Sequence, residues 1–549
     1  MKQAIRRRSR AARQSLRSRL RILPTGLVEV FTTREASGWV AAPPDAKPIR
    51  VSLHVDGLEV TAGWAATPRS DRAAFGEARS FRLRFSDVWK YAGPKNKLTV
   101  RANGTPLPIA GVGMYLVPKK PGQRSLKRLR NEMSEGYVFS QTGRLQLSKK
   151  VDTEWQAAVL KLYDGVRQVL DEVHGCDLFL FFGSLLGAVR EGGVIGHDLD
   201  FDSAYVSKHT DGRDAARELR DIALLLVERG YDVDLKQTVL HVHPMGDHSF
   251  RIDVFHLYFD AAGRLAVPWG VAGNTEVMLS DWNGTKEIDF LGSRVLVPSN
   301  DTQVVEHLYG SGWRRPQPGF MWTRERTKRA WEGIIPPSYI ETVYWANFYA
   351  RTGVATASTF FEKVNGWPDI PGHIIDIGCG DGRDSHAFAS AGRSVVGLDR
   401  SAIGVQHARD KALELGLADR VRFEVCDVAV ADDVRAVLAS AMADPAVPVV
   451  FYLRFFLHSV PEDVQETLMQ TIADVARPGD MLAAEFRTDK DEARSKTFGG
   501  HYRRFQSGPG FGRGLREKYR FEVLDEQEGT GLSVYKNEDP ELYRVIARR

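Results

Sequence analysis

Apolar and polar side chains alternate with period two in several short stretches of the first hundred residues. The stretches 49–55 and 81–85 show the alternation most clearly, and Asp56-Gly57 follows the first of them as a turn signal. Short strands at this spacing are typical of a small antiparallel sandwich. The pattern therefore predicts an all-β sandwich over 25–116, for which a packing or glycan-binding accessory role is the default interpretation.

The hydrophobic pattern changes further along the chain. Residues 117–150 are rich in Lys, Arg, Pro and Gly, which predicts a linker. A helical repeat over 152–173 opens a region of mixed strand and helix signals, so we expect an α+β middle domain over 150–320. After a polar, proline-containing break at 313–338, strands and helices alternate regularly. This alternation predicts an α/β domain with a parallel sheet over 340–549.

Composition agrees with a multidomain globular protein. The chain has 549 residues, of which 43% are hydrophobic and 26% charged, and this length suggests three or four domains. The three cysteines, Cys176, Cys379 and Cys426, are too few and too scattered for a disulfide framework, which favours a reducing compartment. No apolar stretch is long enough to span a bilayer, and no secretory signal is evident. We therefore expect a cytoplasmic protein.

The positive charge is concentrated at the N-terminus. The formal net charge is +5, but residues 1–23 hold nine of the 75 basic residues and no acid. Without these nine, 66 basic residues face 70 acidic ones, so the rest of the chain carries −4 and does not predict a nucleic-acid-binding body. The basic tail, residues 1–24, has two interpretations: a basic helix on an anionic membrane surface, which would make the protein peripheral to the inner membrane face, or a solvated arm.

Acidic residues recur with period two in the middle region. Asp198, Asp200 and Asp202 are separated by Leu199 and Phe201. On a strand the three aspartates would share one face, while the two apolar residues would point into the core. Like charges so placed repel one another unless a cation lies between them. Magnesium suits such oxygen ligands and bridges to substrate phosphates. A bare run of solvated aspartates is the alternative.

Two further features of the middle region bear on this choice. Asp253 lies within the apolar strand pattern Ile-Asp-Val-Phe, where a lone acid is costly to bury without a partner. A Gly183-Ser184 pair precedes the aspartates and begins the block Gly-Ser-Leu-Leu-Gly-Ala-Val-Arg, which ends at Arg190. Both features favour a metal and phosphate site over a solvated loop.

The region 150–320 resembles the LicD/fukutin family of the nucleotidyltransferase superfold. The resemblance rests on the Gly-Ser block, the aspartate run, the Ile-Asp-Val-Phe strand and the Leu-Tyr-Gly motif at 308–310. It implies transfer of a phospho-alcohol from a CDP-linked donor to a glycan such as a cell-surface polysaccharide. It also implies roles for individual residues: Asp198, Asp200, Asp202 and Asp253 as Mg²⁺ ligands and catalytic residues, and Gly183, Ser184 and Arg190 in substrate binding. The sequence departs from the family at 195–197, where members commonly have an aromatic residue and extra acids and this chain has Ile-Gly-His.

A glycine-rich turn follows an apolar strand in the C-terminal region. Asp376 ends the strand, and Gly378, Gly380 and Gly382 follow at alternate positions, where they allow close backbone approach to a ligand. Asp399 ends the next strand about twenty residues later, where an acid can accept both hydroxyls of a ribose.

Asp427 ends a third strand of the same region. NAD enzymes share part of this pattern. The region 340–549 nevertheless resembles the class I S-adenosylmethionine-dependent methyltransferases, which have a Rossmann-like α/β fold. The resemblance implies that S-adenosylmethionine is bound by Asp376, the three glycines, Asp399 and Asp427.

The methyl acceptor is indicated less directly. Arg454, Arg487 and Arg503 come from three separate segments and could converge on an anionic acceptor, because guanidinium groups match phosphate. Structural ion pairs are the alternative for Arg487 and Arg503. His458 is a candidate general base, although methyl transfer often needs only alignment.

Together these features predict a bifunctional enzyme that transfers a phospho-alcohol to a polysaccharide and methylates the same product. An RNA-modifying nucleotidyltransferase-methyltransferase is the alternative, with the tail gripping RNA. The acidic body and the LicD-like motifs argue against it, so no nucleic-acid partner is expected. A glycan-binding scaffold with two degenerate sites is a third interpretation, against which the intact acidic and glycine motifs stand.

Overall fold

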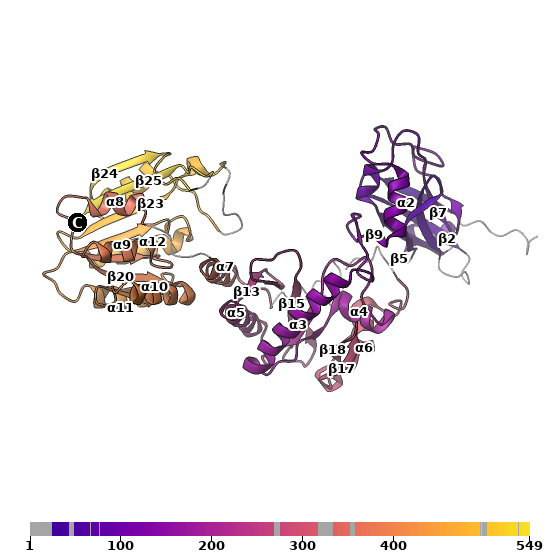
Figure 1. The fold of residues 1–549 in the computed structure, drawn as a ribbon, viewed down its shortest axis with the longest axis horizontal. Helices are drawn as coiled ribbons and strands as arrows, with labels where there is room; N and C mark the ends of the chain where they lie inside the picture. Colours follow the sequence, from indigo (N-terminus) through magenta and orange to yellow (C-terminus); the bar gives the residue numbers. More distant parts are fainter. Residues whose placement is uncertain are drawn as a thin grey trace, which may run out of the picture. The chain divides into compact units, whose positions relative to one another are not determined.

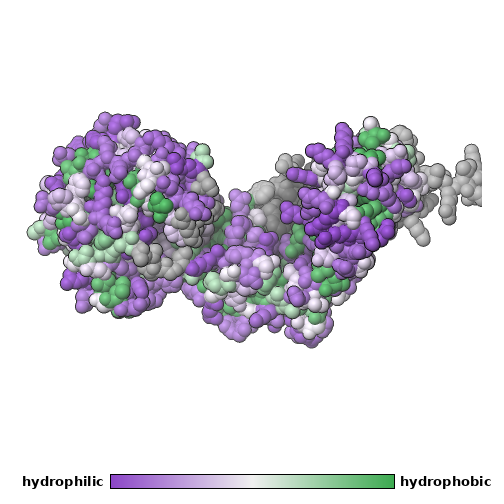
Figure 2. All heavy atoms as spheres, turned by 45° about the horizontal axis from the view of Figure 1, so that its top comes forward, coloured by the Kyte–Doolittle hydropathy of each residue, from purple (hydrophilic) through white to green (hydrophobic). Residues whose placement is uncertain are grey.

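The computed structural model describes residues 25–42, 49–65, 67–75, 77–267, 275–316, 333–351, 357–494, 496, 502–535 and 537–549. The predicted basic tail lies outside the described residues. The chain forms two compact units, Met1–Ala216 with His248–Ile334 and Arg217–Asp247 with Ile335–Arg549 (Figure 1). Hydrophobic side chains are scattered among hydrophilic ones on the visible surface (Figure 2).

The N-terminal part of the first unit contains two four-stranded sheets. One has the order β1 (Thr25–Phe31), β2 (Glu35–Ala42), β6 (Glu77–Arg84), β5 (Thr67–Pro68), and the other β4 (Leu58–Trp64), β3 (Arg50–Val55), β7 (Leu98–Ala102), β8 (Thr105–Pro106). All pairings are antiparallel. Both sheets contribute to one hydrophobic core. Asp56 and Gly57 turn the β3–β4 hairpin with φ of 47° and 82°, which explains the Asp-Gly pair.

Residues 117–150 are structured and are not the simple linker that their composition predicts. They form α2 (Leu126–Ser134), β9 (Tyr137–Phe139) and β10 (Leu145–Leu147). The side chains of Leu129 and Phe139 join the core of the two N-terminal sheets. The linker prediction from composition was wrong because a few apolar residues are enough to anchor a short hairpin and a helix to an existing core.

The middle region of the first unit is mixed α and β. Its elements are α3 (Thr153–His174), β11 (Phe179–Leu180), α4 (Phe182–Glu191), β12 (Asp202–Val206), α5 (Gly212–Glu228, which continues into the second unit), β15 (Ile252–Phe259), β16 (Leu265–Ala266), β17 (Thr285–Phe290), β18 (Ser293–Pro298) and α6 (Asp301–Tyr309). The Asp152 side chain caps α3 by accepting from the Trp155 amide. The predicted helix is present, but Val173 at its end is 48% exposed rather than buried.

The second unit contains the predicted α/β domain. Its seven-stranded sheet has the order β21 (Val421–Val425), β20 (Ser394–Asp399), β19 (His373–Ile377), β22 (Val449–Arg454), β23 (Met481–Arg487), β25 (Leu542–Arg548), β24 (Glu522–Gly529). The first five strands in this order are parallel, while β25 and β24 are antiparallel to their neighbours. The sheet is therefore mixed at one edge, a feature that the regular strand–helix alternation did not indicate.

Helices cover both faces of this sheet (Figure 1). Ile375 and Ile377 of β19 face a core shared with α11 (Ala431–Ala441), α12 (Glu462–Val475) and α13 (Gly508–Glu517). Ile374 faces the opposite core, which contains side chains of α8 (Thr359–Asn365), α9 (Arg383–Ser390) and α10 (Ala402–Glu414). The near-continuous apolar run of β19 follows from burial on both faces.

The second unit also includes the separate piece Arg217–Asp247, which contains β13 (Tyr231–Leu235) and β14 (Leu240–Pro244). Helix α7 (Pro337–Arg351) connects this piece to the rest of the unit. Asn347 of α7 is buried, and its Nδ2 donates to Asp232 Oδ1 at 3.0 Å. Its Oδ1 accepts from the amide of Val233 at 3.2 Å. One side chain thus contacts a buried carboxylate and a backbone donor, which holds α7 on β13.

Candidate active sites

Three carboxylates meet where β12 and β15 lie side by side. Asp200, Asp202 and Asp253 each place an oxygen within 4.8 Å of the other two. The two strands are parallel neighbours, and Asp202 is paired with Asp253 in their register. Residues paired in register point to the same face of a sheet, which explains how two acids 51 positions apart in the chain come together.

The three aspartates of the period-two run do not share one strand. Only Asp202 belongs to β12, which begins at that residue, while Asp198 and Asp200 lie in the preceding loop. Phe201 is fully buried as expected, whereas Leu199 is 45% exposed. The predicted alternation therefore fails before Phe201, because the chain reaches the sheet only at the end of the run.

Asp198 is held by the segment that composition predicted to be a linker. Gln141 Nε2 donates to Asp198 Oδ1 at 2.8 Å. Gln146 Nε2 donates to the Asp198 carbonyl oxygen at 2.7 Å. Sequence reasoning missed both glutamines, since neither is part of a motif and both act across more than fifty residues.

The acidic cluster is electrostatically strained. Burial raises the pKa of Asp202 well above its usual value, and the charges of Asp200, Asp198 and Asp253 raise it further. Burial, followed by the charge of Asp200, raises the pKa of Asp198 to about 7. Arg251 Nε lies 2.7 Å from Asp253 Oδ1 and offsets part of the charge. Four acids with one arginine beside them form a site that favours added positive charge.

Helix α4 begins against this cluster. Phe182, its first residue, has φ of 37°, an uncommon left-handed conformation for an aromatic residue. The Gly183 amide donates to Asp202 Oδ2 at 2.9 Å, and a Cβ at Gly183 would lie 2.5 Å from Asp198 Oδ2. Ser184 is buried, and its Oγ accepts from the Asp202 amide at 2.8 Å. Gly183 thus borders the carboxylates, while Ser184 fixes the start of β12.

Arg190 lies near the other end of α4. Its side chain is 10% exposed, and Nη2 pairs with Glu191 at 2.7 Å. Nη1 lies 3.4 Å from the carbonyl oxygen of Trp313. Tyr309 is close enough to the acids that the charge of Asp202 adds to the effect of burial, and together they raise the pKa of the Tyr309 hydroxyl. The Leu-Tyr-Gly motif therefore lies beside the aspartates.

The second site is built on the glycine turn of the α/β domain. Gly378, Gly380 and Gly382 have φ of 79°, 60° and 80°, which L side chains rarely adopt. The turn ends at α9, and Asp399 Oδ2 accepts from the Gly380 amide at 3.0 Å. A carboxylate at the end of β20 thus fixes the turn after β19.

The three acids of this site lie in different environments. Asp376 is buried and its Oδ2 accepts from Ser385 Oγ at 2.6 Å, while burial raises its pKa to about 7. Asp399 also accepts from the Ser401 amide at 2.8 Å. Asp427 is exposed and follows β21. Asp399 and Asp427 line a cavity, whereas Asp376 is not part of its lining and contacts α9 through Ser385.

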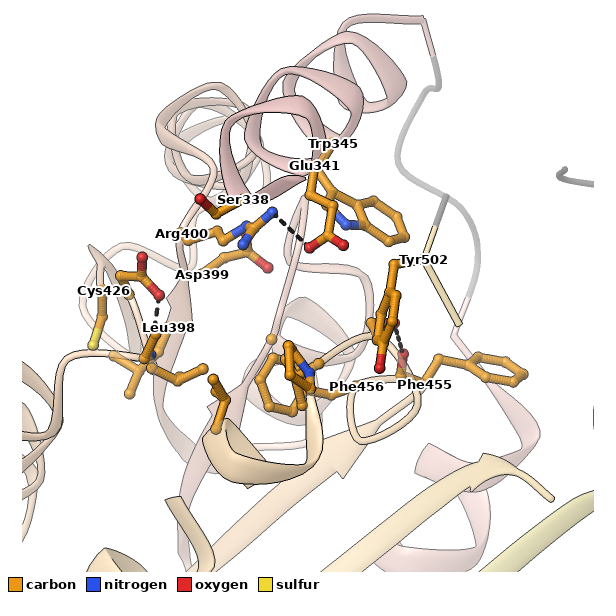
Figure 3. Close-up of a pocket in the computed structure, with 18 of the residues that line it drawn as sticks. Ser338, Glu341, Trp345, Leu398, Asp399, Arg400, Cys426, Phe455, Phe456 and Tyr502 are labelled. Carbon is orange, nitrogen blue, oxygen red and sulfur yellow. Dashed lines mark hydrogen bonds and ion pairs between the residues drawn. The ribbon is translucent and has the colours of Figure 1, made fainter. Parts of the chain in front are cut away.

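This cavity has a volume of about 270 Å³ (Figure 3). One part is formed by Gly378, Asp399 and Asp427. Aromatic side chains from three other segments complete it: Trp345 and Tyr349 of α7, Phe455 and Phe456 after β22, and Tyr502. The cavity is therefore acidic where the strands end and aromatic elsewhere.

Helix α7 is the element that sequence analysis did not assign to this site. Figure 3 shows Glu341 of α7 reaching toward Arg400, and their side chains lie 3.5 Å apart. The Tyr349 hydroxyl lies directly over Gly380. The aromatic run of α7 was the available signal, but aromatic residues on a helix more often indicate core packing.

Arg454 is neutralised by its neighbours. Its Nε lies 3.3 Å from Glu485 and 3.6 Å from Asp384, both of which are buried. Arg544 Nε also lies 2.6 Å from Glu485. The structure therefore places Arg454 in an ion-pair network below the end of β22.

The other predicted acceptor residues lie near one another. Arg487 pairs with Asp491 at 2.7 Å and with Glu538 at 2.6 Å. Arg503 is half-buried, and burial together with the charge of Arg487 lowers its pKa. His458 is buried, and its Nδ1 accepts from the Arg487 amide at 3.3 Å. The structure thus brings His458, Arg487 and Arg503 together. Arg454 has its own ion-pair partners, but its guanidinium lies 4.7 Å from the centroid of the Phe455 ring, which the Arg487 guanidinium also approaches at 5.9 Å.

The two sites define a chain with two transferase domains. The LicD/FKTN/FKRP nucleotidyltransferase family matches residues 175–300, and a methyltransferase domain family matches residues 374–479. The chain therefore carries a LicD-type domain and a methyltransferase domain, as the motifs predicted. Among the described residues, no helix is long and apolar enough to cross a membrane.

The similar proteins include several methyltransferases. The 2-heptyl-1-hydroxyquinolin-4(1H)-one methyltransferase of Mycobacteroides abscessus is 27% identical over 110 residues, which are 20% of this chain and 44% of that protein. The chain thus spans less than half of that relative. A methyltransferase structure from Methanosarcina mazei, described as SAM-dependent, is 18% identical with a TM-score of 0.28, covering 36% of this chain and 99% of that one. Burkholderia thailandensis 1,6-didemethyltoxoflavin-N1-methyltransferase, solved with S-adenosylhomocysteine, is 19% identical with a TM-score of 0.26, covering 35% and 76%.

Proposed function

We propose that the LicD-type domain transfers a phospho-alcohol from a CDP-linked donor to a glycan, and that the methyltransferase domain methylates the product. The observation that carries the first activity is the cluster of Asp200, Asp202 and Asp253, whose oxygens lie within 4.8 Å of one another. Such a cluster is costly to bury unless a cation or a cationic partner is present. A phospho-transfer site meets this requirement.

The donor set fits a magnesium ion. Asp200, Asp202 and Asp253 supply the hard oxygen ligands that magnesium prefers, and Arg251 contacts only one of these three at hydrogen-bond distance. When bound, the ion would neutralise the donor pyrophosphate. The three carboxylates would hold the ion, and the bare backbone of Gly183 allows the Asp198 and Asp202 carboxylates to pack closely against the start of α4.

Asp198 is the best candidate for the general base of this reaction. It lies outside the three-carboxylate cluster, and its pKa of about 7 matches proton transfer near neutral pH. Its Oδ1 is occupied by Gln141, so Oδ2, which faces Gly183, is the atom that would take the proton from the acceptor hydroxyl.

The second activity is methyl transfer from S-adenosylmethionine. Gly378 of the glycine turn lines the cavity together with Asp399 and Asp427, so a ligand there could approach the backbone closely. The cofactor supplies the methyl group when bound. The aromatic walls formed by Trp345 and Tyr502 would exclude water and align the acceptor with that group.

The decisive experiment incubates the full chain with CDP-linked alcohols and extracted polysaccharide, with and without S-adenosylmethionine, and measures product masses. We expect a phospho-alcohol adduct, followed by a further gain of methyl mass when the cofactor is added. Asp202→Asn should abolish the adduct, whereas Asp289→Asn, which changes an exposed aspartate of β17, should not. Wild-type transfer by folded Asp202→Asn, or nucleotide addition to RNA instead, would refute the proposal.

A further inference from the structure

A rigid loop in the N-terminal domain exposes apolar side chains to solvent. Within residues 110–117, which we name the apolar loop, Val112, Met114, Tyr115 and Val117 are 53%, 49%, 43% and 42% exposed. Single exposed apolar residues are ordinary, but four within six positions form a contiguous feature.

Hydrogen bonds at both ends hold the apolar loop in place. Ile109 exchanges backbone hydrogen bonds with Gly113 at 2.7 and 3.1 Å, and Leu98 exchanges them with Leu116 at 2.8 and 2.9 Å. Ile109 is buried in the core. The loop could therefore not withdraw its apolar side chains into the core without breaking these bonds, so their exposure is a fixed property of the fold.

The apolar loop lies within a segment that has no acidic residue. Residues 88–131, which we name the basic segment, contain ten Lys and Arg and no Asp or Glu. Lys119 and Lys120 follow the loop directly, and both are exposed. Lys97 lies against the loop, with its Nζ 4.7 Å from the centroid of the Tyr115 ring.

Few of these positive charges are neutralised within the protein. Among the described residues, Lys90 pairs with Asp87, while Arg124 and Arg128 share Glu132. Among the described residues, no ion pair joins a carboxylate to Lys95, Lys97, Lys119 or Lys120, although the Asp56 carboxylate accepts from the Lys97 amide and from Asn96 Nδ2. The basic segment therefore carries an excess of positive charge, although the chain without its tail is slightly acidic.

We propose that the apolar loop and the basic segment form a docking surface for an anionic lipid bilayer. The side chains of Val112 and Met114 would enter the boundary between head groups and acyl chains, and the surrounding lysines would contact lipid phosphates. Apolar insertion combined with basic residues is the arrangement that gives stable but reversible binding to anionic membranes. This surface is formed by other residues than the tail at 1–23, and the proposal does not depend on either proposed activity.

A glycan fits the same surface less well. Sugar recognition requires acceptors for hydroxyl groups, and the basic segment has no carboxylate. Lys97 already covers one face of Tyr115, the only aromatic ring of the loop. Val112 and Met114 offer no polar group at all. Charge and hydrophobicity together therefore favour lipid.

The first test measures binding of the full chain to vesicles by co-sedimentation. We expect binding to phosphatidylcholine vesicles that contain about one third phosphatidylglycerol, and little binding to phosphatidylcholine alone. The double variant V112D/M114D should bind at least about tenfold more weakly, and K119E/K120E should lose about fivefold for each lysine. Leu413→Asp changes an even more exposed apolar residue, in α10, and should bind as wild type does.

The second test separates the loop from the tail. The three native cysteines are buried, so a cysteine at position 112 can be labelled selectively with an environment-sensitive fluorophore. We expect a blue shift of its emission on anionic vesicles, even after residues 1–23 are deleted, and no shift for a label at position 413. Binding that persists in V112D/M114D and disappears with the tail would overturn the proposal. A blue shift with polysaccharide but not with vesicles would equally overturn it and would assign the surface to a glycan.

Discussion

Asp202 and Asp253 occupy paired positions on two neighbouring parallel strands, β12 and β15. Parallel strands in register point such side chains the same way, so the two carboxylates are held together by the sheet rather than by a loop. The Gly183 amide, at the start of α4, donates to Asp202 from the other side. A rigid support of this kind makes the cluster sensitive to small changes at Gly183.

Substitution Gly183→Ala should therefore impair phospho-transfer without unfolding the domain. The new Cβ would lie 2.5 Å from Asp198 Oδ2 and 3.2 Å from Asp202 Oδ2, so the carboxylates would have to move. We expect a loss of about 100-fold in kcat, the scale of a small misplacement at a reacting centre. Steady-state kinetics would measure it. Gly193→Ala is the matched control, since its Cβ would meet only Leu291 at 3.5 Å; equal activities would contradict the prediction.

Substitution Gly380→Ala should weaken binding of S-adenosylmethionine. Gly380 has φ of 60°, and an added Cβ would collide with the Tyr349 side chain. We expect the dissociation constant, measured by titration calorimetry, to rise at least about tenfold. Gly372→Ala has open space around it and ordinary φ, so it should bind the cofactor normally. Unchanged affinity in Gly380→Ala would remove the turn from the proposed cofactor site.

Substitution Arg454→Ala should act on stability. It would remove the arginine that lies 3.6 Å from the buried carboxylate of Asp384 and would leave the buried carboxylate of Glu485 with Arg544 alone. Breaking a buried ion pair in this way costs about 3–5 kcal/mol of the free energy of unfolding. Chemical denaturation would measure this loss. The exposed Arg435→Ala should change stability by less than about 0.5 kcal/mol. A stable Arg454→Ala protein with weakened acceptor binding would instead support an anion-binding role.

Substitution Gln141→Leu should change the pH profile of phospho-transfer. Gln141 donates to Asp198 and thereby lowers the pKa of that carboxyl, against the larger effects of burial and Asp200. Without the donor the pKa should rise further above about 7, so the basic form becomes available only at higher pH. We expect an upward shift of the acidic limb and a loss of about tenfold at neutral pH. A uniform loss at every pH would indicate a merely structural role, and exposed Gln123→Leu is the control.

The domain that contains His256 should lose stability in mild acid. Burial lowers the pKa of His256 to about 4, whereas an unfolded chain has the usual value of 6.5. Between these values only the unfolded state takes up the proton. This contribution to stability is complete above pH 6.5 and falls by about 1.4 kcal/mol per unit as pH approaches 4. Denaturation midpoints at pH 7.5 and 5 would measure it; the fall should be smaller in His256→Gln but unchanged in exposed His248→Gln.

The sequence alone was enough to predict the parts of the two sites that depend on a local residue pattern. The three glycines and Asp399 could be identified because the first strand, the tight turn and the second strand lie close together along the chain. Asp253 could be identified because an acid within an apolar strand is costly to bury without a partner. Both domain families were recognised from such local motifs, and the family comparisons bear them out.

The sequence alone could not predict contacts between residues that lie far apart along the chain and meet only in the folded protein. Gln141 reaches Asp198, and Tyr349 covers Gly380, across long separations without any motif that marks them. Arg454 looked available for an anionic acceptor because the two acids that neutralise it, Asp384 and Glu485, belong to other elements. Whether a charged side chain is neutralised depends on its neighbours in the folded structure, and a single sequence does not show these neighbours.

The contacts of helix α7 affect where the chain could be cut to obtain a methyltransferase fragment. A fragment that began at residue 357 would keep the whole stretch matched by the methyltransferase family but lose the tyrosine over the glycine turn. A fragment that began at residue 335 would keep α7 but strip Asn347 of its partners on β13. Those partners are encoded inside the stretch matched by the LicD family. A methyltransferase fragment therefore keeps all of these α7 contacts only if it includes residues that belong to the LicD-matching stretch.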